Sequence, residues 1–459
     1  MKKWLKIGVM AILAAIIFIA ITYRIINQPP PANLTSEMQA RTILETGGCL
    51  SCHSADGEKP FYASFPIVGF MVKGDIEKGL KHEDLAKTYE SLASGNKIDE
   101  TILAKIEKVV TDGSMPLHRY YMIHWGASLN KEEKSMMLSW VKKQRETHYA
   151  TGLACEEFAN EPIQPIVDSI PVNPDKVELG KILFHDTRLS SDNTVSCASC
   201  HDLNTGGVDN KQYSEGVGGQ FGGVNAPTVY NAAFNFVQFW DGRAGTLAEQ
   251  AAGPPLNPVE MASQSFDDII AKLAADKEFT KRFIAIYPDG YSEKNITNAI
   301  EEFEKTLITP NSAFDRYLKG DKSAISQEAI DGYALFKENK CATCHVGVNL
   351  GGQSYEYMGL AHSYFEERNA PITEEDNGRF KQTKEERDRH RFKVPGLRNI
   401  ELTAPYFHDG SQKTMKDAVQ YMAKYQLGDE LKDDDAEKIV TFMNTLTGEF
   451  QGKKLTSAN

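Results

Sequence analysis

The pattern Cys-x-x-Cys-His occurs three times in this sequence, and no other feature restricts the fold as strongly. The copies begin at residues 49, 197 and 341. Two thiols separated by two residues and followed directly by a histidine attach a c-type haem: the cysteines form thioethers and the histidine ligates the iron. A single copy would also fit a redox or zinc motif. Three copies predict three covalently bound haems, attached through Cys49, Cys52, Cys197, Cys200, Cys341 and Cys344 and ligated by His53, His201 and His345.

Length and charge narrow the class of protein. A chain of 459 residues is too long for one small cytochrome and predicts two or three domains. Its content of 41% hydrophobic and 25% charged residues is typical of a globular protein. The net charge of −12 argues against nucleic-acid binding, which needs basic surfaces. The seventh cysteine, Cys155, stands outside the repeats, and we interpret it as an ordinary buried or surface thiol.

The N-terminus combines three lysines with an uncharged apolar run from Ile7 to Tyr23. This run is near the minimum length of a membrane-spanning helix, and a cleaved signal peptide is the alternative. No clear Ala-x-Ala cleavage site follows, and Trp4 and Tyr23 suit the two membrane interfaces. We therefore expect an uncleaved single-pass anchor in a bacterial inner membrane, with a cytoplasmic tail. The haem domains then lie in the periplasm.

Helical periodicity recurs along the chain and strand signals are sparse, so the predicted fold class is all-α. Three cytochrome c-type haem domains follow in tandem behind the N-terminal transmembrane helix. Residues 293–310 predict one clear helix, ended by Pro310, and residues 327–338 predict another. The expected division is a tail (1–6), an anchor (7–24), a tether (25–35), an N-terminal monohaem domain (36–150), a linker (151–175), a second haem domain (176–318) and a third (319–459).

Two of these domains end on similar amphipathic helices. Asn130 is the predicted N-cap of the first, and acidic residues occupy the first turn of the second, where they favour the helix dipole. The predicted buried positions are Met137, Trp140 and Val141 in the first helix, and Ile439, Phe442, Met443 and Leu446 at the end of the chain.

Methionines supply candidate sixth ligands for two of the haems. Met115 precedes a proline after a Gly-containing turn, which is the usual way a small cytochrome c presents its sulfur, so we assign it opposite His53. A structural role for Met115 is the alternative, because other methionines are nearby. For the third haem, Met358 and Met422 are both candidates, and Met422 stands on a helix beyond the haem loop. Ligation by histidine and methionine fills both axial positions and predicts electron transfer.

The middle motif, CASCH, has a different continuation. A Gly-rich loop follows it, then NAPT, FWDGR and a lone acid, Glu260, in PVEM. This combination predicts an iron with an open sixth position and a carboxylate beside it. A carboxyl group there can accept a proton and return it.

The middle and C-terminal two-thirds of the chain resemble the bacterial dihaem cytochrome c peroxidases over nearly their whole length. The matching strings are LSSDNTVSCASCHDL, NAPTVYNAAFN, QFWDGRA, LAEQA, VEMA, FEKTLITP, NLGGQ, VPGLRNI and LTAPYFHDG. With an anchor and a third, N-terminal haem, the chain is similar to the membrane-bound trihaem quinol peroxidases within that family.

The resemblance assigns roles to individual residues. The CASCH haem is implied to be the peroxidatic one and the CATCH haem its electron relay. The implied roles are His201 as peroxidatic proximal ligand, His345 and Met422 as relay ligands, Glu260 as distal acid and base, Gln250 as its neighbouring hydrogen-bond donor, Trp240 as the aromatic residue between the two haems, and Phe239 as another residue of the pocket.

Two further implications concern calcium and the Gly-rich loop. Asn225, Thr403 and Pro405 match groups that supply a bridging calcium ion, and oxygen-rich ligation of this kind suits a hard cation. Many dihaem relatives place a removable histidine ligand in the Gly-rich loop, whereas this sequence has Val217 there. An aliphatic side chain cannot ligate iron, so we expect a peroxidatic haem that needs no reductive activation.

The implied function is the reduction of hydrogen peroxide to water with electrons from a membrane quinol. A soluble cytochrome c or a cupredoxin is the alternative donor. A second alternative is a related family that oxidises a partner protein, in which a tyrosine replaces the relay methionine; Tyr421 adjoins Met422 here. A non-enzymatic trihaem electron carrier is the third. Composition and motifs leave the oligomeric state and the type of quinol open.

Overall fold

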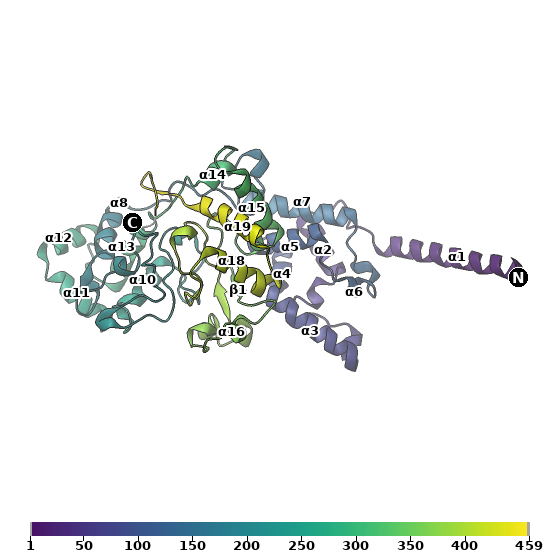
Figure 1. Ribbon diagram of the computed structural model, residues 1–459, viewed down its shortest axis with the longest axis horizontal. Helices are drawn as coiled ribbons and strands as arrows, with labels where there is room; N and C mark the ends of the chain where they lie inside the picture. The colour runs from purple at the N-terminus through teal and green to yellow at the C-terminus, as the bar shows by residue number, and fades with distance from the viewer. Residues whose placement is uncertain (1, 457–459) are drawn as a thin grey trace. The chain divides into compact units, whose positions relative to one another are not determined.

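The computed structural model describes residues 2–456, without the side chains of Lys2 and Lys3. Met1 of the predicted tail and residues 457–459 of the predicted third haem domain lie outside the described residues. The chain divides into two compact units, Met1–Tyr149 and Ala150–Asn459 (Figure 1). The first unit holds the first haem motif, and the second unit holds the other two. The sevenfold division expected from the sequence stays a prediction.

The all-α prediction is confirmed, since helices dominate both units. Those of the first unit are α1 (Lys2–Ile26), α2 (Ser36–Thr46), α3 (Pro66–His82), α4 (Ala86–Ser94), α5 (Glu100–Asp112), α6 (His118–Tyr121) and α7 (Lys131–His148), with 3-10 turns η1 (Cys49–Ser51), η2 (Phe61–Ser64) and η3 (Trp125–Ala127).

The second unit continues the same architecture. Its α-helices are α8 (Pro174–Phe184), α9 (Cys197–Cys200), α10 (Leu247–Leu256), α11 (Phe266–Ala274), α12 (Lys277–Ile286), α13 (Glu293–Glu304), α14 (Ala313–Leu318), α15 (Gln327–Glu338), α16 (Tyr364–Glu367), α17 (Phe380–Thr383), α18 (Met415–Met422) and α19 (Asp433–Met443). Its described strands form two short antiparallel pairs, β1 (Tyr355–Tyr357) with β2 (Arg391–Lys393), and β3 (Glu449–Phe450) with β4 (Lys453–Lys454).

The core of the first unit lies between α2, α5 and α7. Leu103, Trp140 and Val141 are fully buried there, as the periodicity of α7 predicts. Asn130 accepts a hydrogen bond from the Glu133 backbone N–H, and the Glu133 carboxylate accepts one from that of Asn130, which closes a capping box. The predicted N-cap is therefore confirmed.

Helix α1 is apolar and exposed along its length. Residues Trp4–Ile26 are long and apolar enough to cross a membrane, which extends the predicted span of residues 7–24 at both ends. A signal sequence passes the same test of length and composition. The C-terminal end of the helix packs on the first unit, where the Tyr23 hydroxyl donates to Ser128 Oγ at 3.0 Å.

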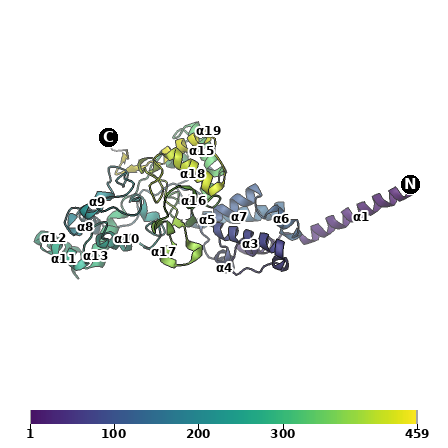
Figure 2. The ribbon, with the colours of Figure 1, turned by 60° about the horizontal axis from the view of Figure 1, so that its bottom comes forward.

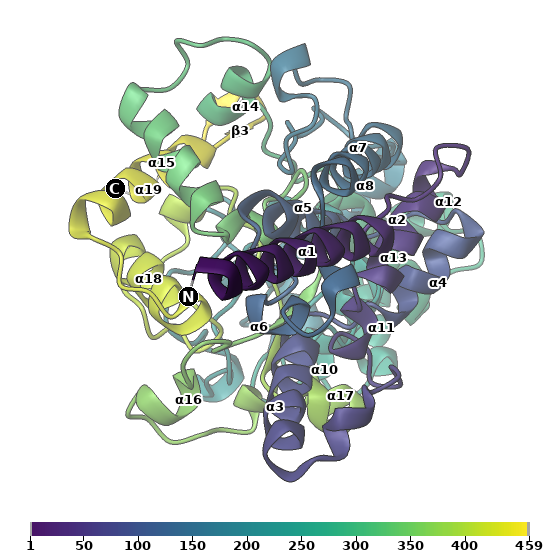
Figure 3. The same ribbon diagram turned by 90° about the vertical axis from the view of Figure 1, so that its right-hand side faces the viewer.

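Two hydrophobic cores organise the second unit. The first core lies between α8, α10, α11, α12 and α13, and the second lies between α14, α15 and α19. Figures 1 and 2 show the two groups of helices apart from each other. Figure 3 shows α14, α15, α18 and α19 on one side of the view. Helix α15 matches its predicted bounds. Helix α13 ends at Glu304, whereas the sequence predicted that it would continue to Pro310. The segment after Glu304 forms hydrogen bonds with Asn231 and does not continue the helix. The Asn231 N–H donates to the Leu307 carbonyl, and the Asn231 side-chain oxygen accepts from the Thr309 N–H.

The two halves of this unit are interlocked. The expected linker is packed rather than free, since Ile163 and Ile166 are fully buried and the Ile166 N–H donates to the Asp315 carboxylate. The C-terminal hairpin returns to the first core, where Phe450 meets Tyr230 edge to face at 5.3 Å between ring centroids. Segments that surround the second and third haem motifs are thereby held in one body.

Candidate functional site

The three motif histidines share one hydrogen-bonding arrangement. Their Nδ1 atoms lie 3.1, 3.4 and 3.1 Å from the backbone carbonyls of Glu83, Gly207 and Leu350, respectively. A carbonyl only accepts, so Nδ1 carries the proton in His53, His201 and His345, and Nε2 keeps the lone pair that ligates a metal. Burial lowers the pKa of each imidazole, that of His345 to about 4, which keeps it neutral. The tautomer and charge of all three fit a haem ligand.

Lys393 provides a second test of whether the residues near the third motif suit a bound haem. It is 4% exposed, and its ammonium forms no hydrogen bond or ion pair with any residue that the structure describes. Burial lowers its pKa to about 8. The chain from Lys393 runs on to Pro395, whose carbonyl lies against the His345 imidazole. A buried cation without an anionic partner is costly, so this position suits a haem propionate.

Glu260 lies in a turn directly after α10. Its Oε1 accepts a hydrogen bond of 2.6 Å from Asn257 Nδ2, at the C-terminal end of that helix. Burial raises the pKa of the Glu260 carboxyl, while the charge of Arg243 and the bond from Asn257 lower it. The predicted acid is therefore held in one orientation and shielded from solvent.

The Gly-rich loop contacts the backbone of this same turn. The Val217 N–H donates to the Glu260 carbonyl at 2.8 Å. At Gly216 a Cβ would lie only 2.3 Å from the Val259 carbonyl oxygen, so a larger residue does not fit. Val217 packs on the first core. The structure thus brings an aliphatic loop residue beside the acid.

Phe239 and Arg243 lie on the same side of α10. The Arg243 guanidinium stands 3.4 Å from the Phe239 ring centroid, and it is paired with the buried Asp241. Phe239 has φ 66°, a left-handed conformation that bulky residues rarely adopt and that is typical of functional sites. The ring edge approaches Gly253, one turn beyond Gln250 on the helix. Sequence reasoning missed Arg243, although it belongs to the FWDGR string.

Trp240 lies between the two halves of the second unit. Its indole N–H donates to the Asn225 carbonyl at 2.9 Å, and its backbone carbonyl accepts from the Lys393 N–H. The indole packs on a small cluster of buried residues, as does Met422. The members of this cluster are Met358, Tyr364, Phe365, Phe392 and Tyr425, with Tyr421 and Phe407 at its edge.

The choice of relay ligand stays open on this geometry. Met358 is buried within the cluster, whereas Met422 and Tyr421 are half-buried at the end of α18. A π-helical turn, η12 (Ala423–Leu427), follows Met422 directly, and such turns are frequent at functional sites. In the first unit, Met115 lies half-buried on the loop that joins α5 to α6.

The predicted calcium ligands adjoin one loop. Asn225 is buried, and its side-chain amide donates to the Lys211 carbonyl at 2.9 Å. From the same loop, Asn210 donates to the carbonyls that flank Thr403 in sequence, those of Leu402 and Ala404. The described residues contain no group of three or more His, Cys, Asp or Glu side chains placed to hold a metal ion. A site of amide and carbonyl oxygens, including that of Pro405, stays a prediction.

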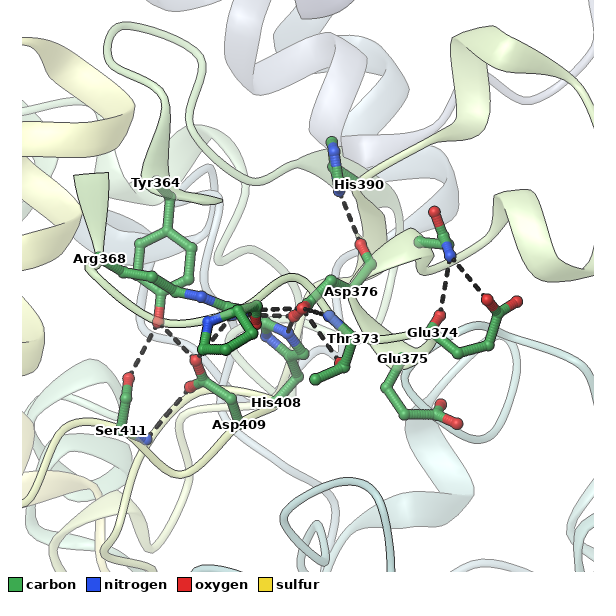
Figure 4. A network of polar contacts seen from close by, with 12 residues as sticks. Tyr364, Arg368, Thr373, Glu374, Glu375, Asp376, His390, His408, Asp409 and Ser411 are labelled. Atoms are coloured by element: carbon green, nitrogen blue, oxygen red, sulfur yellow. Dashed lines mark hydrogen bonds and ion pairs between the residues drawn. The ribbon is translucent and has the colours of Figure 1, made fainter. Parts of the chain in front are cut away.

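A buried polar network adjoins Trp240. Figure 4 shows His408 and Arg368 meeting at Asp376, which is 1% exposed. Asp376 Oδ1 accepts from His408 Nε2 and from Arg368 Nη1, both at 2.8 Å. Although burial alone raises the pKa of Asp376, these two donors hold it well below the usual range. The His408 ring meets Trp240 edge to face, so the network supports the wall on which this indole rests.

Comparisons with known proteins agree with this geometry. Residues 174–323 match the family described as "Di-haem cytochrome c peroxidase", residues 11–143 match "Haem-binding domain", and residues 329–447 match "Cytochrome c". Cytochrome c peroxidase Ccp of Escherichia coli (strain K12) is 49% identical over 406 residues, which cover 88% of this chain and 87% of that protein. Cytochrome c551 peroxidase of Nitrosomonas europaea is 49% identical over 299 residues, covering 65% of this chain and 87% of that protein.

A solved structure gives the same result for the fold. The crystal structure of a MauG-like protein associated with microbial copper homeostasis has a TM-score of 0.54 and 26% identity, and the match covers 62% of this chain and 93% of that one. Haem-attachment motifs on an all-α scaffold, with these matches, define an enzyme that is a c-type haem peroxidase. The chain belongs to the di-haem cytochrome c peroxidase family.

Proposed function

We propose that this protein is a membrane-anchored trihaem peroxidase of the bacterial periplasm. It reduces hydrogen peroxide to water with electrons from membrane quinol. The electrons pass from the N-terminal haem to the relay haem at His345 and then to the peroxidatic haem at His201. Three haem-attachment motifs with matching histidine tautomers and the apolar helix α1 support this assignment.

The observation that carries the proposal is the half-buried Glu260 beside an aliphatic loop. A haem held by His201 would supply an iron that binds and reduces peroxide. Glu260 takes the proton from the bound peroxide oxygen and returns it to the leaving oxygen, and Asn257 fixes the carboxyl for both transfers. A raised pKa suits a group that must hold and release a proton near neutral pH. Gln250 orients the peroxide, and Phe239 keeps the pocket dry.

Val217 assigns the resting state of this haem. Because no ligating side chain stands at this position of the loop, a haem held by His201 would be open to peroxide in the oxidised protein without a reductive activation step. A low-spin signal from two nitrogen ligands on this haem would contradict the proposal.

The remaining predicted residues serve electron transfer and assembly. Met115 completes the N-terminal haem, and Met422 completes the relay haem. Trp240 lies between the two haem segments of the second unit and carries electrons between them. A calcium ion held by Asn225, Thr403 and Pro405 joins the same segments.

A soluble cytochrome c is the second candidate donor. The relative from Nitrosomonas europaea is a cytochrome c551 peroxidase, and its match covers 65% of this chain. Its name suggests that the shared part accepts electrons from a small cytochrome.

The test is peroxide reduction by the detergent-solubilised, fully haem-loaded protein with a reduced quinol as the sole donor. We expect turnover that Glu260→Gln lowers by about 10²–10⁴-fold, since one acid–base group contributes that much, while all three haems stay attached. Turnover with a reduced cytochrome but not with quinol would transfer the donor role to the cytochrome. Near-normal turnover of Glu260→Gln would remove this residue from the chemistry.

A further inference from the structure

A tyrosine–histidine cluster lies at the first haem motif and has no role in the peroxide chemistry. The Tyr62 hydroxyl lies 3.2 Å from His124 Nε2, and His124 Nδ1 lies 3.2 Å from the Tyr120 carbonyl. The carbonyl accepts, so Nδ1 carries the proton and Nε2 accepts from Tyr62. The Tyr120 ring stacks on the imidazole at 4.1 Å between centroids. His124 therefore presents a basic nitrogen toward Tyr62.

This cluster adjoins the residues that attach the first haem. A Cβ at Gly48, directly before Cys49, would overlap the Tyr120 hydroxyl, so the phenol lies on the attachment loop. Burial raises the pKa of both phenols, and the Cys52 thiol lies close enough to add to the effect. A redox-active molecule held by Tyr62 and His124 would thus be near the haem edge.

The segments that carry this cluster also carry an unusual exposed apolar surface. Tyr62 belongs to η2, which leads into α3, and there Phe61, Ile67 and Phe70 are each 80% exposed. His124 is flanked by exposed Ile123 and Trp125. Contiguous large apolar side chains of this kind are rare on water-facing surfaces and mark contact with a partner or a membrane.

The apolar surface adjoins the C-terminal end of the membrane-type helix. Tyr23 of α1 bonds Ser128, and Ile26 of α1 packs beside Gly126, two residues beyond His124. The side-chain amide of Asn130 donates to the Asn27 carbonyl just after the helix. Within the first unit, these contacts fix the loop that holds His124 against the C-terminal end of the apolar helix α1.

We infer that Tyr62 and His124 form a quinol-oxidising site that opens to the bilayer through the apolar residues of η2 and α3. A quinol hydroxyl takes the place of the Tyr62 hydroxyl at His124 Nε2 and transfers its proton there. One quinol releases two protons and two electrons and becomes a quinone. The ferric N-terminal haem accepts the electrons one at a time, and one hydrogen peroxide consumes both, with two protons, to form two waters.

This inference rests on the proposed quinol donor, and its test separates the two. The variant His124→Phe keeps the aromatic stack but removes the base, and Tyr62→Phe removes only the hydroxyl. In the holoenzyme, we expect His124→Phe to slow anaerobic reduction of the N-terminal haem by quinol by about 10²–10⁴-fold. Peroxide turnover with a small soluble one-electron donor should stay unchanged. His118→Phe, an exposed histidine on α6 outside the cluster, is the matched control and should behave as wild type.

The outcomes are distinct. Wild-type rates of quinol oxidation in both His124→Phe and Tyr62→Phe would overturn the site while leaving the quinol donor intact. Absence of quinol oxidation in the wild-type protein, with peroxide turnover retained, would refute the donor itself. If His124→Phe loses its haem, then Tyr62→Phe decides, because it preserves the ring packing and removes the hydroxyl that, once displaced from His124, donates to the quinol oxygen. Slower reduction of the N-terminal haem by quinol is expected in Tyr62→Phe, and a wild-type rate would overturn the site. The variant Ile67→Asp should raise KM for a long-chain quinol in vesicles and leave that for a water-soluble quinol unchanged; equal KM values would remove the bilayer route.

Discussion

Two effects of opposite sign act on the pKa of the Glu260 carboxyl group. Burial raises its pKa, and the guanidinium of Arg243 lowers it. Arg243 is itself held over the Phe239 ring and against Asp241, so its position relative to the pocket is fixed. The acid of this site is therefore tuned by a residue that never needs to touch peroxide.

Replacing Arg243 by Gln should raise the pKa of Glu260. A base acts in its deprotonated form, so the acidic limb of kcat/KM for peroxide should move to higher pH. The shift should be less than about one pH unit, because the Arg243 side chain is 39% exposed and solvent screens its charge. The measurement is the pH profile of kcat/KM, with Arg282→Gln, an exposed arginine on α12, as the control. An acidic limb at the same pH in both variants would remove Arg243 from this role.

Replacing Lys393 by Met should lower the reduction potential of the relay haem. Loss of a buried cation beside a propionate favours the ferric form, which carries one more positive charge. We expect a change of about tenfold in the one-electron equilibrium, or about 59 mV, measured by spectroelectrochemical titration. Lys393→Arg should restore the potential, and Lys413→Met, which removes an exposed lysine, should leave it unchanged. A shift confined to the peroxidatic haem would assign the cation to that haem's propionate instead.

Among the elements, the segment that follows α16 depends on one carboxylate. The Asp376 carboxylate accepts hydrogen bonds from His408 and Arg368. It also accepts hydrogen bonds from the backbone N–H and the hydroxyl of Thr373. A loop with few regular hydrogen bonds is thus held by a buried ionic centre. His408 of the same network packs against Trp240. In the proposed electron path, a change at Asp376 would therefore affect electron transfer between the haems.

The variant Asp376→Asn should destabilise the second unit by about 1–3 kcal/mol, because the buried donors of Arg368 and His408 lose a charged acceptor, although Arg368 keeps its ion pair with Asp409. The pKa of Asp376 is depressed in the folded protein, so its contribution is present at neutral pH and is lost as the pH falls through the folded value. Urea unfolding of the holoenzyme at neutral and acidic pH measures both effects. Glu386→Gln, which breaks an exposed ion pair with Arg389, should change stability little. Equal midpoints for the two variants would contradict the buried role of Asp376.

At the scale of the whole molecule, the proposed function assigns electron entry and peroxide chemistry to different parts of the chain. The first unit carries one haem motif with the apolar helix, and the second unit carries the other two motifs with Glu260. The match to the relative from Nitrosomonas europaea spans 299 residues, which is close to the length of the second unit, Ala150–Asn459.

Residues 150–459 expressed alone and loaded with two haems should therefore keep peroxide turnover with a small soluble donor. They should lose quinol-dependent turnover, because the proposed entry site and its haem are absent. Steady-state assays with each donor measure this, and the full-length protein is the control. Quinol-dependent turnover by residues 150–459 alone would place quinol oxidation in the second unit.

Features encoded within one short stretch were predictable from the sequence. The haem motifs, the Asn130 cap, the stripe of α7 and the bounds of α15 each depend on residues only a few positions apart. Contacts between distant stretches were not predictable. Tyr62 meets His124, and Asp376 meets His408, only because the chain folds back on itself. The early end of α13 has the same origin, since Asn231 bonds the backbone of Leu307 and Thr309 in the segment after the helix.

The bond between the Val217 N–H and the Glu260 carbonyl ties the Gly-rich loop to the turn that bears the acid. In the proposed function, Val217 leaves no ligand to release, so the pocket needs no preparatory step before its first turnover. We expect no lag when peroxide is added to the fully oxidised enzyme with its donor. In a cell that meets a sudden pulse of oxidant, the speed of the response would then be set by how fast the membrane supplies electrons.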